Sequence, residues 1–181
     1  MVKHNQFSKN HYWSHVIFII IVVLGLVYYI YSHHWPQVTV RYQQQSFRLL
    51  LADTRPHQIL GLSDRAKLSN LDGMLFLFLD PGRHAMVMRR MNFSLDMIWL
   101  KVDQSNCERG FSLRSFFFPP VLPCRATVVD IAPQIAPEIG YNDNQLTPYF
   151  SRVNSQLVWE ASAGLASKIG LKIGDQVDIS W

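Results

Sequence analysis

The stretch "GMLFLFLDPGRHAMVMRRMNFSLDMIWLKV" (residues 73–102) decides the fold, because it holds two apolar runs of strand length. Residues 73–79 form one continuous run, which is typical of a buried strand, and residues 94–102 form another. The "DPGR" sequence at 80–83 predicts a turn after the first run, since proline fixes φ and glycine accepts a positive φ. A further strand is expected after that turn. The stretch therefore indicates a sheet.

Further strands and two short helices are predicted on both sides of this stretch. The strand patterns lie at residues 37–43, 46–52, 126–133, 155–161 and 176–180. A helical turn is expected between Pro56 and Gly61, and a two-turn helix between Ser162, as its N-cap, and Gly170. The fold class predicted from these elements is mostly β, a compact β-sandwich or barrel with one or two short helices.

An uncharged apolar segment near the N-terminus predicts a single transmembrane helix. The segment "VIFIIIVVLGLVYYIY" (16–31) lies between Trp13 and Trp35, as aromatic residues at the two membrane interfaces would. A cleaved signal peptide is one alternative, although no small–x–small peptidase site follows, and a buried core helix is another. The expected organisation is a cytoplasmic tail at 1–15, a transmembrane anchor at 16–32, a juxtamembrane linker and first strand at 33–43, and a β-sandwich domain at 44–181.

The charges around this segment predict its orientation. Lys3 and Lys9 precede the segment without any acidic residue, and Arg41 is the first charge beyond it. The positive-inside rule then gives a single-pass protein of the cell (inner, cytoplasmic) membrane, with a cytoplasmic N-terminus and an extracytoplasmic C-terminal domain. The chain has 17 Lys and Arg against 13 Asp and Glu with no basic run, so we expect no nucleic-acid partner.

The two cysteines of the chain are consistent with an exported domain. Cys107 and Cys124 could pair in an oxidising compartment, with a loop-closure stabilisation of about 3 kcal/mol. The alternative is two unrelated thiols buried as small apolar groups. Between them lie Phe116, Phe117 and Phe118, which we expect either to contact a partner or lipid or to fold back on the domain.

The order of four motifs resembles a known family. "GLSDR" (61–65), "GMLFLF" (73–78), "GRHAMVMRRMNFSLDMIWL" (82–100) and "ASAGLASKIGLKIGDQV" (161–177) are similar in sequence and spacing to the domain of unknown function 192 family. The resemblance covers about residues 44–180. It implies a compact β-sandwich, often exported, with no established activity to carry over. Relative to the family, residues 104–125 form an insertion, expected to be a hairpin with both cysteines inside it.

Four polar residues are the candidate ligand-binding set: Arg65, His84, Arg89 and Asp96. Arginine supplies a two-pronged donor for an anionic or sugar ligand. The alternative for two of them is a structural ion pair between Arg65 and Asp96. In the family, the position of Met86 usually carries an aromatic residue, which indicates an apolar rather than a ligating role.

Metal and enzyme chemistry are weaker hypotheses. If 84–88 were a strand, His84, Met86 and Met88 would share one face and could bind Cu(I), although methionine is also an ordinary core residue. A small envelope hydrolase could use His84 with Asp96, and Glu160 could form a carboxylate pair with Asp96. No catalytic motif is present, so we expect no cofactor, no catalytic set and no firm metal site.

These observations favour a membrane-anchored extracytoplasmic module that binds rather than catalyses. Its expected partners are the membrane itself and either an envelope protein or a polymer ligand.

Overall fold

The computed structural model describes residues 7–103 and 124–180, which form two compact units that divide between His34 and Trp35. The first unit is one helix, α1 (Phe7–His33). Its segment Trp13–Ile30 is long and apolar enough to cross a membrane, by length and composition. A signal sequence near an N-terminus has the same properties. The helix predicted from the apolar segment is therefore present.

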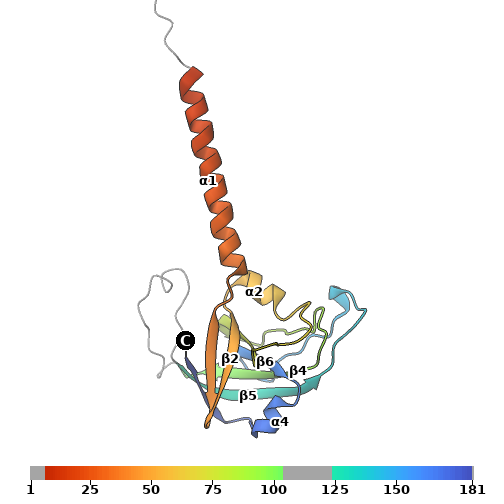
Figure 1. Ribbon diagram of the computed structural model, residues 1–181. Helices are drawn as coiled ribbons and strands as arrows, with labels where there is room; N and C mark the ends of the chain where they lie inside the picture. The colour runs from red at the N-terminus through yellow and green to blue at the C-terminus, as the bar shows by residue number, and fades with distance from the viewer. Residues whose placement is uncertain (1–6, 104–123, 181) are drawn as a thin grey trace, which may run out of the picture. The chain divides into compact units, whose positions relative to one another are not determined.

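The second unit is a closed β-barrel (Figure 1). Its strands are β1 (Gln37–Tyr42), β2 (Gln45–Ala52), β3 (Gly73–Gly82), β4 (Leu95–Val102), β5 (Cys124–Ile135), β6 (Ser155–Ser162) and β7 (Gln176–Ser180). They follow one another around the barrel in the order β1-β2-β3-β6-β4-β5-β7, and β7 pairs back with β1. Neighbours are antiparallel except β2 and β3, which are parallel. The predicted mostly-β class is confirmed. Of the two predicted architectures, sandwich and barrel, the structure has the barrel.

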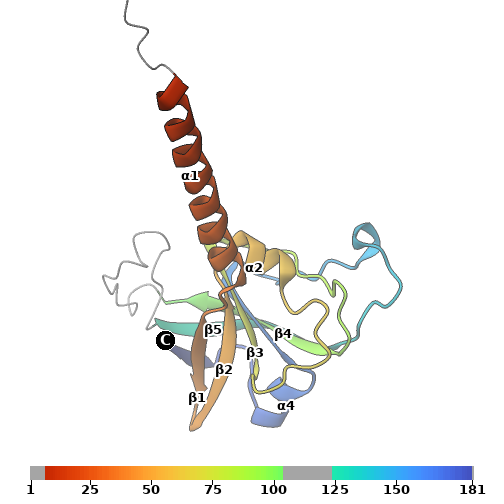
Figure 2. The same ribbon diagram turned by 45° about the horizontal axis from the view of Figure 1, so that its top comes forward.

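The parallel pair explains why a helix lies between β2 and β3, since parallel neighbours need a crossover. That helix is α2 (Arg55–Leu60), the predicted helical turn. Thr54 caps its first turn by accepting a hydrogen bond from the His57 N–H, and Gly61, at φ 52°, ends it. A second short helix, α4 (Leu165–Ile169), and the 3₁₀ turn η2 (Asp143–Gln145) complete the unit. The helices α2 and α4 lie at opposite ends of it (Figure 2).

Alternation along the strands divides the core into two clusters. The inner cluster fills the barrel and consists of Val38, Val40, Tyr42, Phe47, Leu49, Leu51, Leu75, Leu77, Ile98, Leu100, Val102, Cys124, Ala126, Val128, Leu157, Trp159, Ala161, Ala166, Ile169, Leu171, Val177 and Ile179. The outer cluster covers the outside of β2, β3, β6 and β4 and consists of Leu50, Ala52, Leu62, Met74, Phe76, Met86, Met88, Met91, Leu95, Met97, Trp99, Ile135 and Val158. One sheet thus separates two buried layers.

Three local predictions were wrong. The expected turn at 80–83 is largely strand, because β3 continues to Gly82 through a register shift after Leu77. The expected strand through His84 is irregular and makes only an isolated bridge between Met86 and Tyr149. The predicted N-cap, Ser162, is instead the last residue of β6.

The first residue of α4 follows Gly164, which adopts φ 84° and is the N-cap. An aspartate carboxylate from β4, Asp96, accepts hydrogen bonds from the N–H groups of Gly164 and Ala166. A tertiary partner therefore caps the helix, and no local serine is needed.

Part of the predicted insertion lies outside the described residues. This applies to Cys107 and to Phe116, Phe117 and Phe118. Cys124 begins β5 and is buried in the inner cluster. The disulfide between Cys107 and Cys124 and the phenylalanine contact stay predictions.

Candidate functional site

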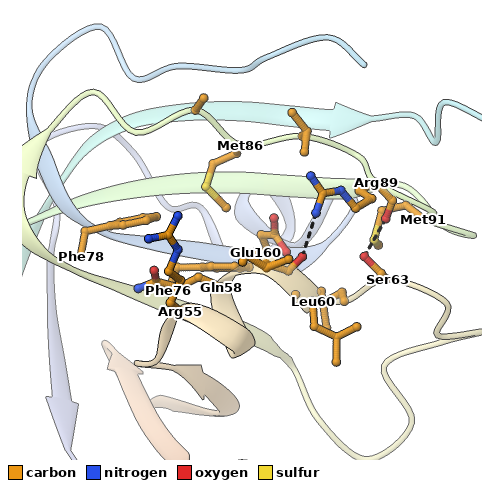
Figure 3. A pocket seen from close by; sticks show the side chains of 15 residues that line it. Arg55, Gln58, Leu60, Ser63, Phe76, Phe78, Met86, Arg89, Met91 and Glu160 are labelled. Atoms are coloured by element: carbon orange, nitrogen blue, oxygen red, sulfur yellow. Dashed lines mark hydrogen bonds between the residues drawn. The ribbon is translucent and has the colours of Figure 1, made fainter. Parts of the chain in front are cut away.

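A pocket of about 280 Å³ lies beside α2, on the outer side of the sheet (Figure 3). α2 and the residues after it form one wall, β3 forms another, and the irregular segment after β3 forms a third. Its lining residues are Arg55, Gln58, Ile59, Leu60, Gly61, Leu62, Ser63, Phe76, Phe78, Ala85, Met86, Val87, Arg89, Met91 and Glu160. Most of them are apolar, as is usual for small-molecule sites, and a few polar groups converge among them.

Glu160 is the most unusual of these polar groups. It lies on β6 opposite Met74 of β3 and Met97 of β4, so its side chain leaves the sheet on the outer side. The residue is only 4% exposed. Among the described residues its carboxyl group has no hydrogen-bond or ion-pair partner. Burial raises the pKa of Glu160 to about 8, from an ordinary value of 4.5. At neutral pH the group is therefore mainly a neutral acid, able to donate and to accept a hydrogen bond.

The other polar side chains of the pocket differ in how fully they are used. Gln58 donates to the Leu77 carbonyl at 2.6 Å, and the Ser63 hydroxyl donates to the Arg89 carbonyl at 2.9 Å. These bonds attach α2 to β3 and the segment after Gly61 to the segment after β3. These hydrogen bonds hold the walls of the pocket together and leave Gln58 and Ser63 with little hydrogen-bonding capacity for a ligand.

Two arginines also line the pocket. Arg89 Nε lies 3.1 Å from Asp143 Oδ2, and its Nη1 donates to the Ile59 carbonyl at 3.3 Å. Arg55, the first residue of α2, is exposed and makes no hydrogen bond or ion pair within the described residues. The charge of Arg89 is therefore balanced by an acid, and that of Arg55 is not.

Asp96, predicted as a ligand-binding residue, has a different position. It is fully buried, and its carboxylate accepts three backbone hydrogen bonds of 2.8 to 2.9 Å from Gln134, Gly164 and Ala166. Asp96 pairs with Ala161, one position along from Glu160, so the two carboxyls leave the sheet on opposite faces. The hypothetical carboxylate pair is not formed.

Of the four predicted ligand-binding residues, Arg89 alone lines the pocket. His84 stacks on Phe78 with ring centroids 3.8 Å apart, and its Nε2 lies 2.9 Å from the Asp80 carbonyl oxygen. Arg65 lies over the Trp35 ring, with its guanidinium carbon 5.7 Å from the centroid. The alternative ion pair of Arg65 with Asp96 is absent from the described contacts. The Asp96 carboxylate instead accepts hydrogen bonds from backbone N–H groups.

The hypothetical copper ligands are not arranged along a strand. Met86 and Met88 are buried in the outer cluster, which is the packing role favoured from the sequence. Among the described residues no group of three or more His, Cys, Asp or Glu side chains could hold a metal ion.

A second buried polar cluster lies beside α2. His57 stacks under Trp35 with centroids 4.1 Å apart, and its Nδ1 lies 3.4 Å from Asp53 Oδ1. The His57 Nε2 atom is buried without a hydrogen-bond partner in the described structure. The stacking is aromatic packing that holds the segment before β1 on the barrel, reinforced by the 2.7 Å hydrogen bond from the Leu51 N–H to the Pro36 carbonyl.

Sequence reasoning missed Arg55 as a site residue and assigned Glu160 only to a pair with Asp96. One signal for Glu160 was available. It is the single ionisable residue in β6, and seven of the eight residues of that strand are buried. A charged residue in a buried strand needs either a partner or a function.

Comparisons with known proteins agree with this fold. Residues 37–106 match the family described as domain of unknown function 192, "Uncharacterized ACR". No curated protein matches the chain.

Two crystal structures are similar. One is a protein of unknown function from Novosphingobium aromaticivorans, with 26% identity, a TM-score of 0.56, and coverage of 81% of this chain and 85% of that chain. The other, from Sinorhizobium meliloti, is described as a candidate transcription regulator, with 20% identity, a TM-score of 0.56, and coverage of 80% and 92%. At that identity the second likeness shows the fold alone. The match of that family model to residues 37–106 confirms the resemblance to the domain of unknown function 192 family that was drawn from the motifs.

Proposed function

We propose that this protein is a membrane-anchored, extracytoplasmic binding module whose ligand occupies the pocket beside α2. The observation that carries the proposal is Glu160, a buried carboxyl group that lines the pocket and has no partner among the described residues. Burying a polar group without a hydrogen bond is unfavourable, and a fold that only needed stability would place an apolar residue there. A bound ligand supplies the missing partner.

Pocket size and lining favour a small molecule, or one unit of a polymer, over a flat protein partner. The pocket volume of about 280 Å³ lies just below the range of about 300 to 1,000 Å³ that is usual for small-molecule sites, so the ligand has to be small. Phe76, Phe78 and Met86 supply apolar contact. Arg55 and Glu160 supply polar groups that no other described residue bonds to. A polymer of the cell envelope could present one such unit.

Catalysis is the second candidate function, and it has less support. The proposed hydrolase set needs His84 and Asp96 together. Asp96 is occupied by three backbone N–H groups, and His84 is stacked on Phe78. Glu160 could serve as a general acid, but no described nucleophile or base contacts it.

Anchoring and location follow from the N-terminal segment. Trp13–Ile30 has the length and composition of a membrane span, and Lys3 and Lys9 precede it. These features favour a cytoplasmic N-terminus and a barrel outside the cytoplasm. A disulfide between Cys107 and Cys124 would fit that compartment.

The pocket can be tested with the full chain in detergent micelles, labelled with [ε-¹³C]methionine. Met86 and Met91 line the pocket, whereas Met97 is buried in the same cluster without lining it. We expect some members of a small-fragment mixture to shift the Met86 and Met91 signals saturably and by more than the Met97 signal. If no fragment shifts either signal selectively, the pocket is not a binding site.

Topology can be tested by cysteine labelling in intact cells, in a background with both native cysteines replaced by serine. A membrane-impermeant maleimide should label Asn144→Cys, an exposed position of the barrel, without permeabilisation. The matched variant Ser8→Cys, before the apolar segment, should react only after permeabilisation. The reverse pattern would overturn the proposed orientation.

A further inference from the structure

The charges of the pocket limit what it can bind. Arg89 is paired with Asp143, so its charge is largely cancelled. Arg55 has no counter-ion among the described residues, and Glu160 lacks one as well. From β3 and β4 the residues packed beside Glu160 are apolar, namely Met74 and Met97. With a neutral carboxyl on Glu160, the described lining of the pocket carries one uncompensated positive charge, that of Arg55.

The two unused polar groups come from different parts of the pocket. Arg55 begins α2 and is exposed, whereas Glu160 comes from the sheet and is buried. In Figure 3 both side chains extend into the space bordered by Phe76, Phe78 and Met86. A ligand that uses both groups therefore needs two polar ends, one at the solvent side and one deep, with an apolar body between them.

The proposal rests on the binding function proposed above and gives it a ligand class. We infer that the pocket binds a small organic monoanion, with its anionic group on Arg55, an apolar or aromatic body against Phe76 and Met86, and a hydrogen-bond acceptor at its inner end facing the Glu160 carboxyl. Arginine matches a carboxylate or phosphate group with two parallel donors. A neutral carboxylic acid donates to a carbonyl or hydroxyl oxygen.

A cation on an ionised Glu160 is the competing ligand class. Ionising a buried carboxyl is unfavourable unless the cation neutralises it, and burial already raises the pKa of this group to about 8. Arg55, which has no counter-ion among the described residues, lines the same pocket and would repel an organic cation on its way in. The charge pattern therefore favours the anion.

Three probes of similar size distinguish these classes: 4-acetylbenzoate, 4-methylbenzoate and benzylammonium. The first carries the anion and an acceptor, the second lacks the acceptor, and the third carries the opposite charge. The methionine methyl signals of the full chain report binding as before. We expect 4-acetylbenzoate to bind about fivefold more tightly than 4-methylbenzoate, because one buried hydrogen bond is gained, and benzylammonium not to bind.

Two variants assign the ends of the ligand. Arg55→Ala should weaken 4-acetylbenzoate about tenfold or more, since a charge-assisted pair is lost, and Arg41→Ala on β1, also exposed and unpaired in the described structure, should leave its affinity unchanged. Glu160→Leu should make the two benzoates bind equally. If Arg55→Ala misfolds, the milder Arg55→Gln can be compared with Arg41→Ala instead. The affinity ranking of the three probes is measured on the wild-type chain and needs no variant.

Tighter binding of benzylammonium than of 4-acetylbenzoate would overturn the ligand class and leave the pocket as a binding site. If none of the three probes binds but the fragment mixture still gives saturable shifts, the proposed ligand class is overturned and the pocket remains a binding site. Failure of the probes and of the fragment mixture together would overturn the class and the proposed binding function.

Discussion

The α4 end of the barrel and the pocket beside α2 each contain one buried carboxyl group, and the two groups have opposite surroundings. Asp96 at the α4 end accepts three backbone N–H groups, from Gln134, Gly164 and Ala166. Glu160 in the pocket has no partner among the described residues. The groups lie on neighbouring strands, one residue out of register, and strand alternation sends them to opposite faces of one sheet.

The comparison separates a structural acid from one available to a ligand. Asp96 fixes the start of α4 and the end of β5, so its charge is fully used in holding the fold together. Glu160 is buried nearly as deeply but makes no hydrogen bond or ion pair with a described residue, and burial raises its pKa to about 8. Burial alone therefore does not distinguish the two roles, whereas the list of hydrogen-bond partners does.

Removing the structural acid should have the largest effect. Asp96→Ala leaves three N–H groups without their acceptor, one of them buried and two part-buried, so we expect the free energy of unfolding to fall by about 4 to 5 kcal/mol. Guanidinium unfolding of the full chain, followed by tryptophan fluorescence, measures this. Asp178→Ala, at an exposed acid of β7 that is paired with Arg125, is the control and should change stability by less than about 0.5 kcal/mol. Equal losses in the two variants would contradict the structural role of Asp96.

The backbone of Glu160 is held tightly even though its side chain is free. Gly73 adopts φ 147°, and a Cβ atom there would lie 2.1 Å from the Glu160 carbonyl oxygen. Gly73→Ala should therefore destabilise the fold by about 4 kcal/mol.

Gly82, on the same strand, is the matched control. Its nearest obstacle is the His84 ring at 3.2 Å, and its φ is not in the left-handed region. Gly82→Ala should lower stability by less than about 1 kcal/mol. A Gly73→Ala variant as stable as Gly82→Ala would show that β3 and β6 are not packed as described.

Glu160 should make the free energy of unfolding fall as pH rises. An ion-paired acid has the opposite effect. Its pKa of about 8 in the folded state lies above the ordinary 4.5 of the unfolded chain. Between these values the unfolded state loses the proton and the folded state keeps it, so this group makes unfolding easier as pH rises, and its effect levels off above about pH 8.

The Glu160→Gln variant isolates this contribution. Relative to wild type, its free energy of unfolding should rise by about 3 kcal/mol between pH 5 and pH 8. Chemical denaturation across that range measures the difference. Parallel pH profiles for the two proteins would mean that Glu160 is ionised when folded.

The smallest effect is expected at the entrance to the pocket. Arg55 has no described partner, so Arg55→Ala should change stability by less than about 0.5 kcal/mol. Arg152 contacts the buried Asp130 through several hydrogen bonds, which lower the pKa of Asp130, and Arg152→Ala should lower stability by about 1.5 kcal/mol. If Arg55→Ala is the more damaging of the two, Arg55 has a structural role.

The barrel was predictable because its strands carry strong local patterns. The hairpin of β1 and β2, the buried run in β3 and the helix between Pro56 and Gly61 follow from neighbouring residues alone. The strand expected around His84 failed for a physical reason. Its alternating methionines pack against the outer face of the sheet as a covering segment, and the same alternation would serve a strand.

The site was harder to predict, because its residues come from segments far apart in the chain. Arg55 and Glu160 line one pocket only when β3 lies between β2 and β6, and no local pattern specifies that strand order. Asp96 and Glu160 were equally good candidates as isolated acids. Only the register of β4 on β6 shows that they face opposite ways.

The protonation of Glu160 tests the account most directly. The chain contains three glutamates, so ¹³C labelling of the glutamate side-chain carboxyl gives three signals, and the Glu160→Gln variant identifies one of them. We predict that in the folded full chain this signal titrates near pH 8 and that the pKa shifts when 4-acetylbenzoate binds. A Glu160 signal that titrates near 4.5 would contradict the buried, unpartnered acid on which the proposed site depends.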